Sequence, residues 1–126
     1  MSNYLLDTHA LIWYRVGNKA FKAVHRQLIE NNDIYVSMVS LWEVALLLQK
    51  NKLATSLSAE EYLNSLVQPS FTLLNLKISQ FSTANELPEH HKDPFDRILI
   101  AQAIENDLTL LTQDAIIPKY PVKTAW

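Results

Sequence analysis

Short apolar runs alternate along this chain with longer stretches in which apolar residues recur at helical spacing. The short runs predict strands, because a buried strand shows a brief apolar segment bounded by polar turns. They lie at residues 4–6, 34–36, 71–74 and 108–112, with a short fifth at 122–124. The longer stretches predict helices. These lie at residues 9–14, 19–30, 40–50, 58–68, 79–87 and 94–106.

The order of these elements, in which strands and helices alternate, indicates an α/β fold. We expect a mainly parallel sheet of four to five strands with helices on both faces. Local signals support two helix starts: Ser58 and Glu61 form a capping box, and Asp93 followed by Pro94 is typical of an N-cap and first helical residue. The helix at 40–50 is apolar nearly all round, which indicates burial or contact with a partner.

Length and composition indicate one folded domain spanning residues 1–126. The chain is 48% hydrophobic and 19% charged, and it is long enough to bury a core without disulfides or structural metals. It contains no cysteine, which excludes a disulfide framework, a zinc–thiolate site and a thiol nucleophile. Its single glycine, Gly17, excludes a phosphate-binding P-loop and a glycine-rich dinucleotide-binding turn.

Charge and hydropathy add expectations about location and partners. No apolar run is long enough to cross a bilayer, and the N-terminus lacks the regions of a signal peptide, so we expect a cytoplasmic protein without a membrane partner. The net charge of −2 and the pI of about 6.0 give no overall basic field. This counts mildly against a nucleic-acid partner.

Four of the thirteen acidic residues fall where ligand sites form in an α/β sheet. Asp7 ends the first predicted strand, Glu43 lies in the first turn of the helix after the second strand, and Asp114 follows the fourth strand. Asp96 lies in the first turn of a later helix. The carboxyl ends of parallel strands and the helix N-termini that follow them share one edge of the sheet, so we expect these acids to meet there.

Carboxylates that meet at one edge repel one another and need a compensating positive charge. A hard divalent cation such as Mg²⁺ or Mn²⁺ supplies this charge, because it prefers oxygen ligands. One or two such ions can activate water and stabilise the leaving oxygen of a phosphodiester. They would also turn an acidic hollow into a phosphate-binding one, which answers the objection from net charge.

Each acid taken alone also has an ordinary structural interpretation. Asp7 could form a turn, Glu43 could close a capping box with Ser40, and Asp96 could be a first-turn acid favoured by the helix dipole. Asp114 could be a loop acid. Their joint placement at one edge is what favours chemistry.

Four segments of the sequence together resemble a known family. They are Leu-Leu-Asp7-Thr8-His9, Ser37-Met-Val-Ser40-Leu-Trp-Glu43-Val-Ala, His91-Lys92-Asp93-Pro94-Phe95-Asp96-Arg97-Ile-Leu-Ile-Ala101-Gln102-Ala103 and Leu110-Leu111-Thr112-Gln113-Asp114. In this order and spacing they resemble the PIN domain, and more closely the VapC-type toxins of bacterial toxin–antitoxin pairs. The likeness covers nearly the whole chain, and the Asp-Pro-Phe-Asp-Arg segment is its most specific part.

This resemblance implies a three-layer α/β/α fold and a Mg²⁺- or Mn²⁺-dependent endoribonuclease. It implies that Asp7, Glu43 and Asp96 act as metal ligands, or that Glu43 orients water. Asp114 matches the last acid of the family pattern, whose residue type varies most, and the resemblance implies that it is a fourth catalytic acid and metal ligand. Thr8 would help to orient the site. The family also implies an RNA substrate, a homodimer and a small antitoxin protein that blocks the active site.

The expected reaction is hydrolysis of an RNA phosphodiester by an activated water, without a covalent enzyme intermediate. Arg97 and Lys92 are candidates for holding neighbouring phosphates, with surface solvation as the equal alternative. Asp93 is mainly a helix cap, and contact with a metal through water is its minor alternative.

Histidines and tryptophans are weaker candidates for the site. His9, His90 and His91 could assist proton transfer, but a lone histidine is more often structural or exposed. Trp13 and Trp42 lie within helical patterns, so we expect them to pack in the core rather than to stack on bases.

Three other protein classes share parts of this pattern. A phosphoacceptor receiver domain needs adjacent acids after the first strand and an aspartate after the third, and the sequence has neither. A phosphatase with a nucleophilic aspartate would have a second aspartate two positions after Asp7, where His9 stands. The remaining alternative is a non-catalytic module that keeps the fold and binds RNA or protein.

Overall fold

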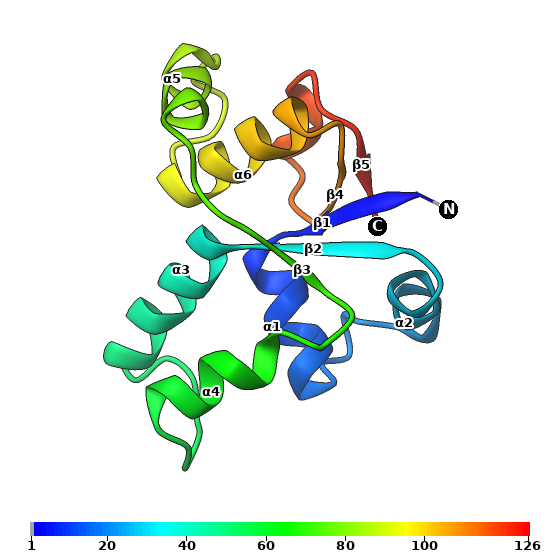
Figure 1. Ribbon diagram of the computed structural model, residues 1–126, viewed down its shortest axis with the longest axis vertical. Helices are drawn as coiled ribbons and strands as arrows, with labels where there is room; N and C mark the ends of the chain where they lie inside the picture. Colours follow the sequence, from blue (N-terminus) through cyan, green and yellow to red (C-terminus); the bar gives the residue numbers. More distant parts are fainter. Residues whose placement is uncertain (1) are drawn as a thin grey trace.

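A computed structural model of the chain describes residues 2–126 and shows three layers, α/β/α (Figure 1). Within these residues, five strands form one sheet: β1 (Asn3–Leu6), β2 (Asp33–Ser37), β3 (Thr72–Leu74), β4 (Thr109–Leu111) and β5 (Thr124–Ala125). They lie in the order β3-β2-β1-β4-β5, and every neighbouring pair is parallel. The predicted α/β class and parallel sheet are confirmed.

Six α-helices and one short 3-10 helix connect the strands in the part of the chain that the structure describes. They are α1 (Thr8–Val16), α2 (Ala23–Glu30), α3 (Met38–Gln49), α4 (Ala59–Leu66), α5 (Ile78–Glu86), α6 (Pro94–Glu105) and η1 (Ile117–Lys119). The largest boundary error is at α2, which was predicted from residue 19. Gly17 ends α1 in the left-handed region at φ 69°, and the N–H of Phe21 then bonds to the carbonyl of Asn18 in a turn that occupies the residues before α2.

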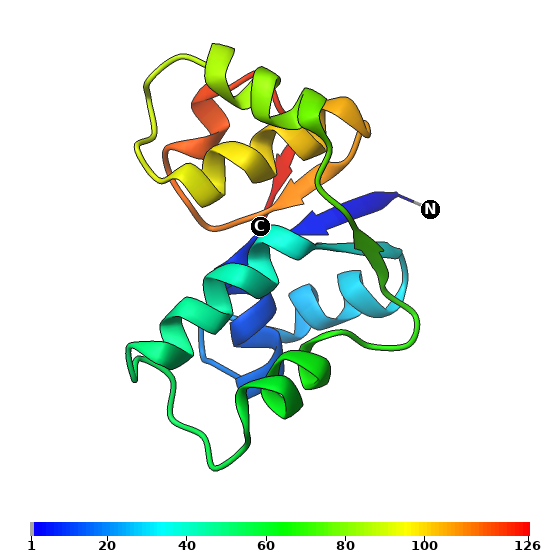
Figure 2. The same cartoon turned by 60° about the vertical axis from the view of Figure 1, so that its left-hand side comes forward.

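Side chains that alternate along the strands divide the core into two halves. Leu5 and Leu110 face the half covered by α5, α6 and η1, whereas Leu6 and Leu111 face the half covered by α1, α2 and α4. Figure 2 shows these two groups of helices on opposite sides of the sheet. Both faces of each central strand are therefore buried, which explains why the strands appear in the sequence as continuous apolar runs.

Helix α3 contributes to both halves of the core and also reaches solvent. Val39 packs in the half beneath α6, and Val44 packs in the half beneath α1. Trp42, however, is 59% exposed, so its predicted place in the core is wrong. Trp42 instead lies on the wall of a hollow that is open to solvent, where its ring centroid lies 5.3 Å from that of Phe95. Trp13 is half-buried against the ring of Trp126.

The strand order reverses between β1 and β4. From β1 the chain proceeds to β2 and β3 on one side, and then returns to place β4 and β5 on the other side. The crevice at the carboxyl ends of strands at such a reversal is where ligands bind in open α/β sheets. Asp7 and Asp114 both follow strands that border this reversal. No helix within residues 2–126 has the length and apolar character needed to span a membrane.

Candidate active site

Asp7 lies where β1 passes into α1, and its side chain is buried. Its Oδ1 accepts the backbone N–H of Ala10 at 2.7 Å, which makes it the N-cap of α1, and its Oδ2 accepts the hydroxyl of Thr112. Burial raises the pKa of Asp7 above its ordinary value, although these hydrogen bonds oppose the rise. A helix cap needs no such burial, so the cap alone does not explain this environment.

Thr112 links two of the predicted acids and was not identified from the sequence. Its buried hydroxyl donates to Asp7 Oδ2 and accepts the backbone N–H of Asp114 at 3.0 Å. The available signal in the sequence is only a hydroxyl residue at the end of a strand, two positions before an acid. Thr112 therefore fixes Asp7 and Asp114 relative to each other.

Asp114 is half-buried on the loop after β4 and is surrounded by donors. Its Oδ1 accepts the backbone N–H groups of Ile116 at 2.7 Å and Ile117 at 3.2 Å. Its Oδ2 lies 3.0 Å from Nε2 of His91. Partial burial alone would raise the pKa of Asp114, but the hydrogen bonds from His91, Ile116 and Ile117 together hold it below its ordinary value. These donors therefore favour the charged form of Asp114.

Asp96 lies in the first turn of α6, as predicted. Burial raises the pKa of Asp96 to about 7, and the charges of Asp93, Asp7 and Glu43 add to the rise, while His91 opposes it. Asp93 is the N-cap of this helix, since its Oδ1 accepts two backbone N–H groups of the first turn, at 2.9 and 3.4 Å. The predicted capping role of Asp93 is confirmed.

Glu43 lies in the second turn of α3, not in the first turn as predicted. The helix begins at Met38 with Ser37 as its N-cap, because Ser37 Oγ accepts the N–H two residues further on. The alternative capping box between Ser40 and Glu43 is therefore wrong. Ser40 instead accepts a hydrogen bond of 3.2 Å from the buried hydroxyl of Thr8, which ties α1 to the first turn of α3.

One oxygen of the Glu43 carboxylate is left unpaired. Its Oε1 is buried and has no hydrogen-bond partner among the described residues. Burial raises the pKa of Glu43, and the charges of Asp93 and Asp7 raise it further, although a hydrogen bond from Thr8 and the charge of His9 oppose the rise. A buried polar atom left without a partner costs about 1–3 kcal/mol, and a bound cation would recover this cost.

His91 lies between two of the acids. Its Nε2 is 3.1 Å from Oδ2 of Asp96 and 3.0 Å from Oδ2 of Asp114, and these three atoms lie within 4.8 Å of one another. His9 and His90 are exposed, so of the three predicted histidines it is His91 that contacts the acids directly.

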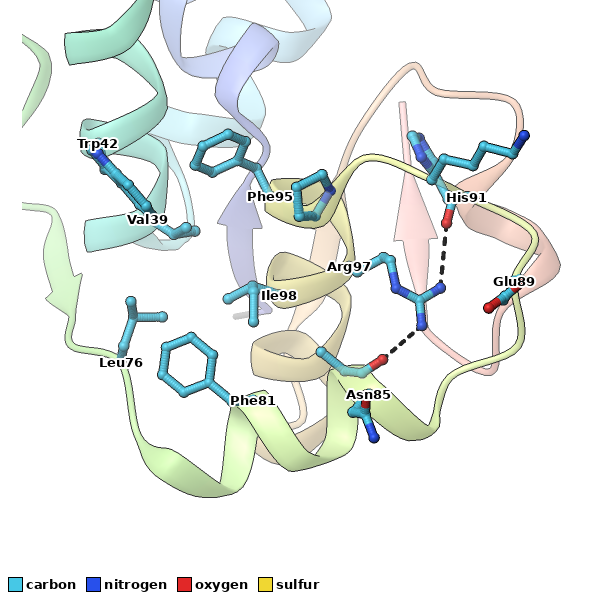
Figure 3. A pocket seen from close by; sticks show the side chains of 13 residues that line it. Val39, Trp42, Leu76, Phe81, Asn85, Glu89, His91, Phe95, Arg97 and Ile98 are labelled. Atoms are coloured by element: carbon cyan, nitrogen blue, oxygen red, sulfur yellow. Dashed lines mark hydrogen bonds between the residues drawn. The ribbon is translucent and has the colours of Figure 1, made fainter.

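Arg97 is held by hydrogen bonds to backbone groups of its own chain. Its guanidinium donates to four backbone carbonyls and one hydroxyl, as seen in part in Figure 3, namely those of Ala84, Leu87, Pro88, His91 and Tyr120. Both terminal nitrogens of Arg97 are used in this way, and the predicted phosphate contact stays a prediction. Lys92 is exposed and remains a candidate for it.

The four predicted acids come from four segments to one edge of the sheet. Asp7, Glu43 and Asp96 each have a raised pKa, and each is influenced by the charge of at least one other acid of the group. Among the described residues, the side chains whose potential ligand atoms all lie within 4.8 Å of one another are His91, Asp96 and Asp114. Asp7 and Glu43 are not in this group. Crowded carboxylates and an unpaired buried oxygen are the donor set that suits a hard divalent cation.

Comparisons with known proteins agree with this fold. VapBC2 from Rickettsia felis, solved with a DNA fragment from its promoter, matches with a TM-score of 0.76 at 16% identity over 98% of both chains. VapC20 from Mycobacterium tuberculosis, described as a sarcin–ricin loop cleaving toxin, matches with a TM-score of 0.64 at 16% identity over 92% of this chain and 93% of that one.

Sequence comparison identifies the family. Ribonuclease VapC22 of Mycobacterium tuberculosis is 29% identical to this chain over 116 residues, which cover 90% of this chain and 88% of that protein. The sequence model of the PIN domain matches residues 4–123, which is nearly the whole chain. The chain therefore belongs to the PIN domain family.

Proposed function

We propose that this protein is a Mg²⁺- or Mn²⁺-dependent endoribonuclease and the toxin of a toxin–antitoxin pair. The observation that carries the proposal is the convergence of Asp7, Glu43, Asp96 and Asp114 at the carboxyl edge of the sheet, with the pKa of the first three raised. The relative named ribonuclease VapC22 and the structural neighbours solved as VapBC complexes support it.

In the proposed reaction, Asp7, Glu43 and Asp96 would hold the cation, with Asp114 beside them. When bound, the cation would supply Lewis-acid activation of water and would stabilise negative charge on the phosphodiester. Ala10 and Thr112 orient Asp7, the unpaired Oε1 of Glu43 would face the cation, and the other carboxylate oxygen of Glu43 can accept the proton of the attacking water. The water oxygen forms a bond to phosphorus while the opposite P–O bond breaks. The leaving ribose oxygen takes up a proton from solvent, and no side chain becomes covalently attached.

Two lysines provide the positive charge that the acidic edge lacks. A hollow of about 400 Å³ beside Glu43 is lined by Lys50 and Lys92, and both lysines are exposed. Because phosphates are recognised mainly by such cations, we assign these lysines to the phosphates that flank the scissile bond.

The proposal includes two protein partners. The first is an antitoxin, because VapBC neighbours were solved as toxin–antitoxin complexes. We assign it to the edge of the sheet that carries Asp7, Glu43, Asp96 and Asp114. We place the protein in the cytoplasm, where RNA is also present. We assign a second copy of this chain to the apolar hollow, a cavity of about 790 Å³ between α3, α5 and α6 (Figure 3). Its apolar lining consists mainly of Val39, Trp42, Leu76, Phe81, Phe95 and Ile98. Exposed apolar surface of this kind marks protein contacts.

The test is incubation of the purified protein with labelled structured RNA and Mg²⁺ or Mn²⁺, with EDTA and with Asp7→Asn in parallel. Asp33→Asn serves as the control, because Asp33 is an exposed acid at the opposite end of the sheet. Cleavage that disappears with EDTA and with Asp7→Asn, but not with Asp33→Asn, supports the proposal. Cleavage that survives both treatments contradicts it. Absence of cleavage with the metal verified as bound would favour the non-catalytic module that binds RNA or protein.

A further inference from the structure

The hydrogen bonds of the His91 ring determine its tautomer. The backbone N–H of Asp93 donates to Nδ1 at 3.1 Å, so Nδ1 carries a lone pair and no proton. Nε2 therefore carries the ring proton, and it faces Oδ2 of Asp96 at 3.1 Å and Oδ2 of Asp114 at 3.0 Å. A protonated Nε2 has no lone pair to offer a cation. His91 thus stands among potential metal ligands as a hydrogen-bond donor, not as a ligand.

The loop that carries His91 is fixed independently of the acids. The backbone N–H of His91 donates to the hydroxyl of Tyr120 at 2.7 Å, and its carbonyl accepts from Arg97 at 3.3 Å. Tyr120 is buried and donates in turn to the carbonyl of Pro88 at 2.7 Å. The backbone position of His91 is therefore set by Tyr120 and Arg97 and does not depend on the acids.

The hydrogen bonds to the acids divide them into two groups. Asp114 already accepts two backbone N–H groups on Oδ1 and faces His91 with Oδ2, so its charge is compensated without a metal. Glu43 has an unpaired oxygen, and Asp96 is buried among other carboxylates. Asp7, Glu43 and Asp96 are therefore the acids whose negative charge still needs a cation.

We propose that His91 is a positioning residue that limits the site to one cation, by occupying with its Nε2–H the gap between Asp96 and Asp114. A cation bound to both Oδ2 atoms would have to lie where this N–H now points, so the two exclude each other. The first cation binds at Asp7, Glu43 and Asp96, and a second binds only when the N–H is removed. This inference rests on the proposed metal-dependent function.

Two substitutions of His91 test the roles of its two ring nitrogens separately. His91→Asn keeps an acceptor near Nδ1 for the N–H of Asp93 but loses the donor toward the acids. His91→Gln restores an amide N–H near the position of Nε2. His90→Ala is the matched control, because His90 is the neighbouring residue and is exposed. Thermal unfolding establishes that each variant is folded before metal is added.

The measurement is titration of each folded protein with Mn²⁺, with free Mn²⁺ followed by electron paramagnetic resonance. We expect one bound Mn²⁺ per chain for the wild type, His90→Ala and His91→Gln, and two for His91→Asn. Nitrogen NMR of the metal-free wild type should show the Nε2–H tautomer of His91.

Other results would overturn the inference. Two Mn²⁺ ions in the wild type would show that His91 does not limit the site. A single ion in His91→Asn, bound about tenfold more weakly than in the wild type, would show that His91 is itself a ligand. A single ion of unchanged affinity in His91→Asn would refute the inference alone. Failure of the wild type to bind any Mn²⁺ would refute the proposed metal-dependent function as well.

Discussion

Asp96 is a carboxylate whose burial opposes its charge, and this makes the stability of the metal-free protein depend on pH. Its pKa in the folded protein is about 7, well above the ordinary range of an aspartate in an unfolded chain. The folded state therefore keeps this proton at pH values where the unfolded chain has lost it. The stabilisation is complete at acid pH and is lost as the pH rises through 7.

We predict that Asp96→Asn raises the free energy of unfolding of the metal-free protein by about 2 kcal/mol at pH 8, because asparagine stays neutral. Near pH 4 the difference should be small, since Asp96 is then protonated in the folded state. Urea unfolding in EDTA at both pH values measures this. Asp33→Asn, at an exposed acid, should change nothing. An Asp96→Asn protein that is less stable than the wild type at pH 8 in EDTA would contradict the argument.

Substitution of Thr112 tests whether cleavage requires Asp7 and Asp114 to be oriented as well as present. Thr112→Val keeps the shape of the side chain but removes the donor to Asp7 and the acceptor for the N–H of Asp114. We predict a loss of about 1–2 kcal/mol of stability and a fall of about tenfold or more in cleavage rate, because two buried groups lose their partners. Thr112→Ser, which keeps the hydroxyl, should restore most of both. Cleavage at the wild-type rate by Thr112→Val would show that this link is dispensable.

At the scale of elements, Arg97 joins the C-terminal end of α5, the following loop and the start of α6. Its guanidinium donates to four carbonyls, including those of Ala84 and Leu87 at 2.7 and 3.0 Å. Loss of this group would leave Ala84 with the N–H of Leu87 and Pro88 with the hydroxyl of Tyr120, but would remove the Arg97 bond from Leu87 and from His91. The loop that holds His91 would be released. The side chain therefore acts on the site through the fold of this loop.

Arg97 and Lys92 form a matched pair for separating structure from RNA binding. We predict that Arg97→Ala lowers the free energy of unfolding by about 3 kcal/mol, because several partly buried hydrogen bonds to a charged group are lost. Lys92→Ala should leave stability unchanged, since the side chain is exposed. It should instead weaken RNA binding and reduce the slope of log affinity against log salt by about one. Urea unfolding and RNA binding at several salt concentrations, in Ca²⁺ in place of the active metal, measure both. Weaker RNA binding by Arg97→Ala without loss of stability, together with unchanged RNA binding by Lys92→Ala, would indicate that Arg97 binds the phosphate.

The elements themselves were largely predictable, because their signals are local. Asp93 and Pro94 open α6 as expected, and Ser58 with Glu61 opens α4 through a capping box. The start of α3 was placed too late because Ser37 and Ser40 are both plausible caps, and only the structure shows that Ser40 is occupied by Thr8. Local patterns do not distinguish two caps within one turn.

The contacts among loops were not predictable, because they join residues far apart in the chain. The placement of the four acids at one edge followed from the parallel sheet. The role of Arg97, by contrast, depends on a loop conformation that brings carbonyls of residues 84–91 around one guanidinium. The contact of His91 with Asp96 and Asp114 depends on the same loop. Nothing in hydrophobic spacing specifies how an irregular segment folds back on a helix.

At the scale of the whole molecule, the sheet is covered on both faces, yet one apolar surface stays exposed in the part of the chain that the structure describes. Trp42 on α3 is 59% exposed and Phe81 on α5 is 51% exposed, and their rings lie on opposite walls of the apolar hollow (Figure 3). Two copies related by a twofold axis would present this hollow to each other and bury both aromatic residues. The helix predicted to be buried or shared with a partner is the one that supplies Trp42.

We predict that Phe81→Glu converts the proposed dimer to a monomer, because a charge placed in a closed apolar contact is left without compensation. Val24→Glu is the matched control, since Val24 is 63% exposed on α2, away from the apolar hollow. Light scattering after gel filtration at several protein concentrations measures the mass of each. Because Phe81 is half exposed in the single chain, the monomer should stay folded. A Phe81→Glu protein that remains dimeric would place the contact elsewhere, and a wild type that is monomeric at every concentration would remove the second copy from the proposal.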